Sequence, residues 1–385
     1  MADNPLLHDN GYRETEELLQ ALEEELQSLY GQAADEMQQK ALDYMDSLIV
    51  SSKEMQRKVQ LGEISKEEYQ RWLQSHLFTA RYYQQMYETL AADLLNANML
   101  AASIMNGYMP EVYAINMNYM TYAIEKAVKV NTLFTLYNRQ AVERILRDSP
   151  DLLPNAKIDI PEDLRWSKMH LNNAVVQGIL QGETIPEIAS RLRTVADMDM
   201  RASIRNARTM TTSAQNGGRL DAMKRVEKMG AKVKKMWIAT LDGRTRHAHR
   251  QLDGQKKPLN EPFESEFGKI RFPGDPEAHP SNVYNCRCSL VTEDPEFPTD
   301  ASDLSMRDSK LAGMSYEEWK DKRPSYPAKK KDDKKSSKKR VNPDNPSYGY
   351  PETYGYTAEF SETIEPQGNT KTYHDQPIPK KRNKK

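Results

Sequence analysis

Apolar residues recur every three or four positions along the first part of the chain, a spacing that predicts amphipathic helices. From Tyr12 to about Lys58 the repeat has no internal proline, and a break is expected only near Gly31. Gly62 ends this helix, and Ser65, which is followed by acidic residues, caps the next one. The helices predicted within residues 1–155 are 12–58, 65–106, 111–128 and 134–147.

A helical pattern continues after Pro161 and predicts the helical part of a second module over residues 156–230. The helices expected there are 162–181, 185–194 and 198–228. The pattern then changes to short apolar runs separated by turn residues, which predicts a small α+β part over residues 231–295. The strands expected in it lie in the segments AKVKKMWIAT, FGKIRFPGDP and NCRCSLVT.

Beyond Pro295 the apolar density falls, and a lysine-rich run is followed by residues dominated by Tyr, Pro, Gly and Asn. Such a composition buries too little apolar surface to offset the entropy lost on ordering, so residues 296–385 are predicted to be a disordered tail. The predicted fold class is mainly α, with long N-terminal helices, a small α+β module and a disordered basic C-terminal tail.

Several classes of protein are not expected. No stretch approaches the roughly 20 unbroken apolar residues that span a bilayer. The N-terminal residues lack a basic segment followed by an apolar one, so no signal peptide is expected, and we expect a protein made in the cytoplasm. The two cysteines, Cys286 and Cys288, are too few and too close for a disulfide framework of the secreted type.

Charge is balanced in total but not along the chain. Fifty-five basic and 56 acidic residues give a net charge of -1, which predicts no general attraction to nucleic acid. The region 320–340, however, holds eleven Lys or Arg against three Asp, and a flexible polycation binds phosphates without needing a fold. A solvated linker is the alternative interpretation. The residues predicted to contact nucleic acid are Lys329, Lys330, Lys331, Lys334, Lys335, Lys338, Lys339 and Arg340.

Histidines and thiols near the end of the second module suggest a zinc site. The predicted ligands are His249, His279, Cys286 and Cys288. On a strand the two cysteines point to one face, and if residues 244–252 are helical, only one of His247 and His249 can join them. The alternative is that both cysteines are small buried apolar residues without a metal.

A metal-dependent nuclease is a second interpretation of the same region. Its candidate metal and base residues are Asp242, His249, Asp253 and Asp275. The Asp-Gly and Gly-Asp-Pro sequences are more simply turns. Arg244 and Arg246 either clamp an anion or pair with Asp242 and Asp253 within a turn. The chain has no P-loop and no Gly-x-Ser-x-Gly elbow, so no catalytic residue and no enzymatic activity are predicted.

Between Trp166 and Thr292 the chain resembles the minor head proteins of bacteriophages, the head morphogenesis family that includes Mu F-like and SPP1 gene-7-product-like proteins. The matching elements, in order, are a helix with Gly-x-x-x-Gly-Glu-Thr and IPEIASRL, Ala-Arg-Thr at 207–209, the Trp strand, Asp242 with RTR and His249, Leu-Asp-Gly, PGDP and NCRC. Met210 stands where the family often has Glu. Arg246 and His249 stand where some relatives have cysteines, and Arg246 cannot ligate zinc.

The resemblance implies a minor capsid protein of a tailed bacteriophage without enzymatic activity, located in the virion at the capsid interior or portal vertex. It would aid head assembly, genome packaging or DNA ejection. The implied partners are the portal protein, the major capsid protein and packaged DNA, which the basic tail would contact. The alternatives are a DNA-binding or metal-dependent nuclease protein that acts on the packaged genome and a scaffolding protein.

Overall fold

The computed structural model describes residues 9–79, 81–297 and 307–326, which belong to one unit of the chain. The predicted nucleic-acid contacts from Lys329 to Arg340 lie outside the described residues. Within them, the predicted fold class is confirmed, because long helices dominate and the strands are confined to a small module.

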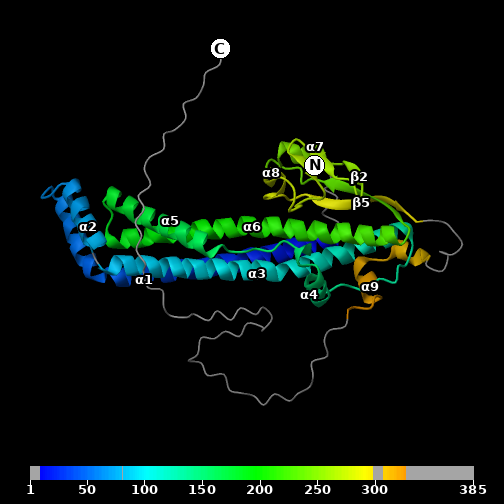
Figure 1. Ribbon diagram of the computed structural model, residues 1–385, viewed down its shortest axis with the longest axis horizontal. Helices are drawn as coiled ribbons and strands as arrows, with labels where there is room; N and C mark the ends of the chain where they lie inside the picture. Colours follow the sequence, from blue (N-terminus) through cyan, green and yellow to red (C-terminus); the bar gives the residue numbers. More distant parts are fainter. Residues whose placement is uncertain (1–8, 80, 298–306, 327–385) are drawn as a thin grey trace, which may run out of the picture. The chain divides into compact units, whose positions relative to one another are not determined.

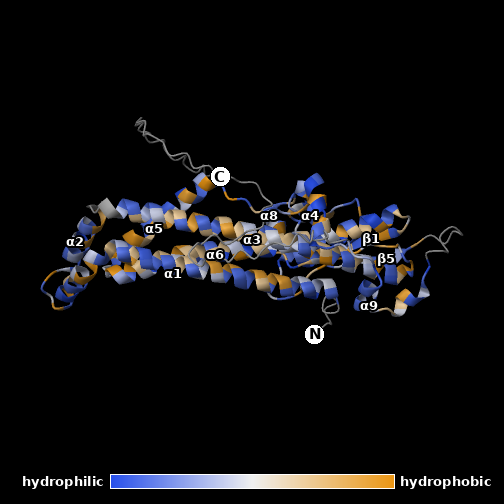
Figure 2. Ribbon diagram, turned by 90° about the horizontal axis from the view of Figure 1, so that it is seen from below, coloured by the Kyte–Doolittle hydropathy of each residue, from blue (hydrophilic) through white to orange (hydrophobic). Residues whose placement is uncertain are grey.

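Long helices pack side by side, and Figure 1 shows α1, α3 and α6 running alongside one another. Figure 2 shows hydrophobic and hydrophilic residues interspersed along these helices, as expected for amphipathic segments. Shorter helices lie against this group, α5 beside α6 and α2 near the end of α1. The helices of this part are α1 (Asn10–Gln60), α2 (Lys66–Thr79), α3 (Arg81–Val128), α4 (Arg139–Asp148), α5 (Ile160–Gln181) and α6 (Ile185–Lys228).

Several predicted helix ends were wrong. The break near Gly31 does not occur, and α3 passes through the predicted end at Asn106 and through Pro110. Likewise, α6 joins the helices predicted at 185–194 and 198–228. The reason is packing, because apolar residues at or next to the predicted breaks are buried against neighbouring helices; Val195 and Ala196, for example, are at most 2% exposed. Tertiary contacts outweigh the local cost of an interrupted hydrogen bond.

The apolar core is divided into two clusters. One lies among α2, α5, the later part of α1 and the beginnings of α3 and α6. The other contains the first part of α1, the later parts of α3 and α6, and the apolar side chains of the small module, including Trp237. The small module therefore shares its core with the long helices.

The small module is built on an antiparallel sheet in which β1 lies between β2 and β5. The Pro-Gly turn after β4 packs against α6, where a Cβ on Gly274 would lie 2.7 Å from the backbone nitrogen of Ser213. The remaining elements are β1 (Lys232–Ile238), α7 (His247–Leu252), β2 (Lys256–Pro258), β3 (Phe263–Ser265), β4 (Gly268–Ile270), α8 (Pro280–Val283) and β5 (Ser289–Glu296).

Residues 307–326 correct the predicted boundary of the tail, because they form η4 (Ser309–Gly313) and α9 (Tyr316–Asp321) instead of being disordered. Trp319 is fully buried and donates a hydrogen bond to Glu125 at 2.6 Å, and Arg323 pairs with the same carboxylate. Leu136 adds backbone hydrogen bonds to this segment, donating to Pro324 and accepting from Tyr326. The prediction used the composition of residues 296–385 as a whole, and this average did not reveal the few apolar residues that pack within 307–326.

Candidate metal centre

His249 reaches the interior of the small module from α7. Ala248, His249 and Leu252 are buried on the inner side of this short helix, whereas His247 is exposed. The helix follows a turn in which Asp242 accepts hydrogen bonds from the backbone of Arg244 and the hydroxyl of Thr245. The prediction that a helical segment brings only one of the two histidines to the site is confirmed.

Cys286 and Cys288 lie just before β5, with side chains 2% and 3% exposed. Their backbone is fixed by α6: the Thr212 hydroxyl donates to the carbonyl of Cys286 at 2.6 Å, and the Asn216 amide donates to that of Cys288 at 3.2 Å. The two side chains therefore point to one place although the regular strand begins only at Ser289.

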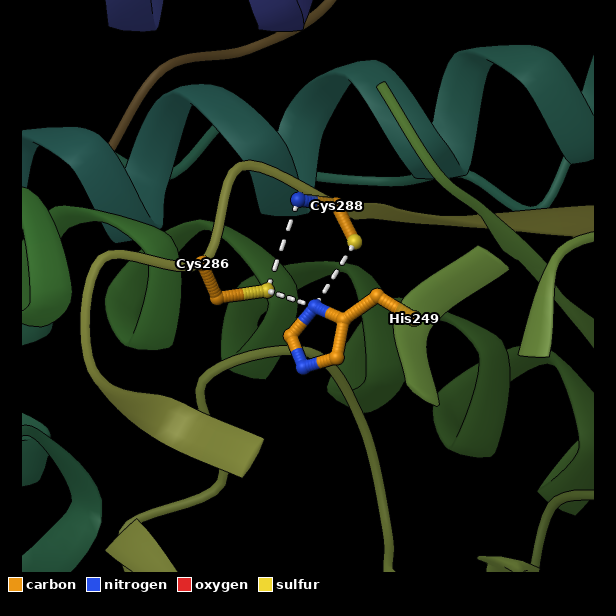
Figure 3. A group of neighbouring side chains, drawn as sticks. All are labelled: His249, Cys286 and Cys288. Carbon is orange, nitrogen blue, oxygen red and sulfur yellow. Dashed lines mark hydrogen bonds between the residues drawn. The ribbon is translucent and has the colours of Figure 1, made fainter. Parts of the chain in front are cut away.

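The three side chains form one buried cluster, which Figure 3 shows in detail. The Nδ1 atom of His249 lies 3.6 Å from Sγ of Cys286 and 3.4 Å from Sγ of Cys288. The ligand atoms of all three residues lie within 4.8 Å of one another, and the described residues contain no other group of three such ligands. The Nε2 atom of His249 is buried and has no hydrogen-bond partner among the described residues.

The two thiols have opposite pKa shifts. Burial raises the pKa of Cys286, but hydrogen bonds from Cys288 and the nearby guanidinium groups of Arg246 and Arg287 more than offset this, and the net pKa is lowered. The hydrogen bond to Cys286 and burial together raise the pKa of Cys288. Cys286 is therefore the sulfur that more readily becomes a thiolate.

His279 does not join this cluster. Its side chain is exposed at the beginning of α8, where its Nδ1 atom accepts a hydrogen bond from the backbone of Ser281 at 3.2 Å. Its ring also stacks on Phe267, with the ring centroids 6.0 Å apart. The structure thus brings together His249, Cys286 and Cys288 but leaves the other predicted ligand outside.

The acidic residues of the nuclease interpretation are separated and occupied by other contacts. Asp242 makes a two-pronged ion pair with Arg287 at 2.6 and 2.8 Å. Asp253 accepts a hydrogen bond from the backbone of Ala239, and Asp275 pairs with Arg271. They do not converge with His249 on one metal position.

The arginine side chains of the turn do not pair with its aspartates. Arg246 donates to the carbonyl of Ser281 rather than pairing with Asp242 or Asp253, so the expected pairing within the turn was wrong for this side chain. The carboxylate of Asp242 forms its ion pair with Arg287 instead. Arg244 contributes its backbone N–H to the turn, and its side chain is exposed.

Residues 169–291, which run from α5 through the candidate metal centre, match the family described as "Phage Mu protein F like protein". The chain is also 28% identical over 242 residues to minor head protein GP7 of Bacillus phage SPP1, an alignment that covers 59% of this chain and 76% of that protein. This part of the chain is similar to the phage minor head protein family. The predicted resemblance is therefore confirmed.

Two further relatives match a smaller part of the chain. An NAD(+)--arginine ADP-ribosyltransferase named EFV, from Enterococcus faecalis, is 27% identical over 154 residues, which are 39% of the present chain and 31% of that enzyme. An uncharacterized protein of Haemophilus influenzae is 29% identical over 153 residues, or 38% of the chain and 31% of the relative. No solved structure gave a significant match. None of the described helices is both long and apolar enough to cross a bilayer.

A second polar site, which the sequence analysis missed, lies where α3, α5 and α6 meet. Asn98 uses its side-chain amide to bridge two carboxylates, donating to Asp163 at 2.9 Å and to Asp199 at 3.1 Å. Tyr30 donates to the side-chain amide oxygen, Oδ1, of Asn98 at 2.6 Å. These residues come from four separate helices, so no spacing along the chain indicates that they meet.

Cavities of about 640 and 350 Å³ border this carboxylate pair, and Lys157 lines both. Burial is the main cause that raises the pKa of Asp199 to about 6, and the charge of Asp163 adds to it. The Oδ2 atom of Asp163 is buried without a hydrogen-bond partner among the described residues, and burial also raises the pKa of this carboxyl. The pair is an electrostatic cost to the folded protein at neutral pH.

Proposed function

We propose that this protein is a minor head protein of a tailed bacteriophage, a structural component of the virion that binds the portal protein at the portal vertex and aids head assembly, genome packaging or DNA ejection. The supporting observation is the family match over residues 169–291, a segment that forms α6 and most of the small module. The major capsid protein is a further proposed partner.

A role without catalysis agrees with the site chemistry. Each acidic residue of the nuclease interpretation is held in an ion pair or a backbone hydrogen bond of the fold. The similarity to the ADP-ribosyltransferase EFV covers 31% of that enzyme, so its activity is not transferred to this chain. We therefore favour a binding role over a metal-dependent nuclease. Incubating the purified protein with DNA and a divalent metal tests this choice, because a nuclease would cleave the DNA.

The proposed contact with packaged DNA is assigned to the basic run from Lys329 to Arg340. Its support is the charge of the sequence, since a run of cations binds duplex phosphates through release of counterions. The scaffolding alternative predicts loss of the protein during maturation. Mass spectrometry of purified mature heads tests it, because a minor capsid protein is retained there and a scaffolding protein is not.

Portal binding is tested on the full chain, because residues 160–295 share a core with α1 and α3 and would lose it when excised. Leu241 and Tyr284 of the small module are 64% and 59% exposed, and Leu61 and Leu180 near the other core cluster are 59% and 58% exposed. Serine substitutions at Leu241 and Tyr284 are expected to weaken capture of the co-expressed portal protein. The control variant carries Leu61→Ser and Leu180→Ser. If only this variant lost capture, the docking surface would lie near Leu61 and Leu180 and not on the small module.

A further inference from the structure

We propose that His249, Cys286 and Cys288 bind one structural zinc ion through Nδ1 and the two sulfurs, with a water molecule as the fourth ligand. The described residues offer no fourth His, Cys, Asp or Glu at this position, and the exposed His279 is excluded. Zinc is the metal proposed because two thiolates and one imidazole suit its borderline-soft character.

The spacing of the ligand atoms fits a single tetrahedral ion. With Zn–S bonds of about 2.3 Å and Zn–N bonds of about 2.0–2.1 Å, neighbouring sulfur and nitrogen ligands are about 3.6 Å apart. The distances from His249 Nδ1 to the sulfurs of Cys286 and Cys288 are 3.6 and 3.4 Å. One imidazole nitrogen faces both sulfurs at once, as metal ligands do, whereas it has only one lone pair or proton for an ordinary hydrogen bond.

Charge supports the same assignment. Two thiolates and a neutral imidazole around Zn²⁺ form a centre with zero net charge, which a buried site tolerates far better than bare thiolates. The backbone N–H of Cys288 points at the sulfur of Cys286 at 3.4 Å, an interaction that stabilises negative charge on that sulfur. Cys286 and Cys288 are nearly inaccessible to solvent, so the charge must be neutralised locally.

The ligands are also held in place from outside the cluster. Thr212 and Asn216 of α6 hold the carbonyls of the two cysteines, and Trp237 of β1 lies edge-on to the His249 ring, with the ring centroids 5.8 Å apart. A metal at this point would tie α7 to the beginning of β5 and both to α6. Its binding free energy would then contribute to the stability of the small module.

The test measures metal in the full chain, purified without chelators. We expect about one zinc per chain, and Co²⁺ substitution should give the thiolate charge-transfer absorption of a site with two sulfur ligands. Cys286→Ser, Cys288→Ser and His249→Ala should each lower the zinc content at least several-fold. His279→Ala and His247→Ala are the matched controls, and both should retain the full zinc content.

A further measurement does not depend on whether the variants fold. When a chelator that changes colour on binding zinc is added to the wild-type chain, it should remove one zinc ion per chain and no more. Well under one zinc per chain, copper in place of zinc, a disulfide between Cys286 and Cys288, or zinc loss in His279→Ala would overturn the assignment. None of these results depends on portal binding, so this proposal and the proposed function fail separately.

Discussion

Replacing Asp199 with asparagine should stabilise the folded protein at neutral and alkaline pH. The side chain is 8% exposed, and its pKa is raised from the ordinary value of 3.8 to about 6. At about 1.4 kcal/mol per pH unit, this difference corresponds to roughly 3 kcal/mol of unfavourable free energy once the carboxyl is ionised. Asparagine has nearly the same shape and keeps an oxygen that accepts from Asn98, so most of this cost should disappear in the variant.

The sign follows from proton binding. The folded state holds the proton of Asp199 up to pH of about 6, whereas the unfolded chain releases it near its ordinary pKa of 3.8. Between these values, raising the pH therefore removes stability, and above about 6 the loss through this group is complete. Asp199→Asn should gain about 2–3 kcal/mol over the wild type at pH 8 and almost nothing at pH 4.

Urea unfolding followed by circular dichroism at pH 8 and pH 4 measures both values. Asp197→Asn, two residues earlier in α6 and only partly buried, is the matched control and should show no such pH-dependent gain. A gain of equal size at both pH values, or a less stable variant at pH 8, would refute the assignment of the cost to an ionised and poorly compensated Asp199.

Two further predictions concern the C-terminal part of the chain. Trp319→Ala should destabilise the protein by about 3–5 kcal/mol, because it removes a fully buried ring and the hydrogen-bond donor to Glu125. Urea unfolding measures this loss, and an unchanged unfolding midpoint would contradict the described packing. Deleting residues 327–385 should abolish most binding to duplex DNA at low salt without changing the melting temperature of the remaining protein. For the intact chain, a plot of log affinity against log salt concentration should have a slope of about -7 if eight phosphates are neutralised. Full-strength binding by the truncated chain would show that other residues contact the DNA.

The periodicity of apolar residues was enough to predict the helical class and the position of most helices. It was not enough to predict where they end. Asn106, Pro110 and the junction at 195–197 looked like boundaries, but the helices continue there because neighbouring helices cover the apolar residues around them. Helix ends depend on such tertiary burial, which a single sequence does not display.

The candidate metal centre was predicted in part for a similar reason. Cys286 and Cys288 are separated by a single residue in the sequence, and helical geometry allowed only one of His247 and His249 to join them. These three ligands could therefore be predicted from local sequence. The position of His279 depends on how the loop before α8 folds, and this loop turns the ring towards Phe267. The pairing of Asp163 with Asp199 was invisible because a third helix supplies the bridging amide.

The docking of residues 307–326 has a mechanical consequence. Leu136 accepts a backbone hydrogen bond from Tyr326 and donates one to Pro324. The buried Trp319 and Arg323 side chains hold the same segment on Glu125. A pulling force applied to the chain beyond Tyr326 would therefore load these contacts before it reached the small module. Because the hydrogen bonds and the buried ring must give way together, the segment should act as a mechanical clamp that shields the remaining fold from tension on the chain that follows.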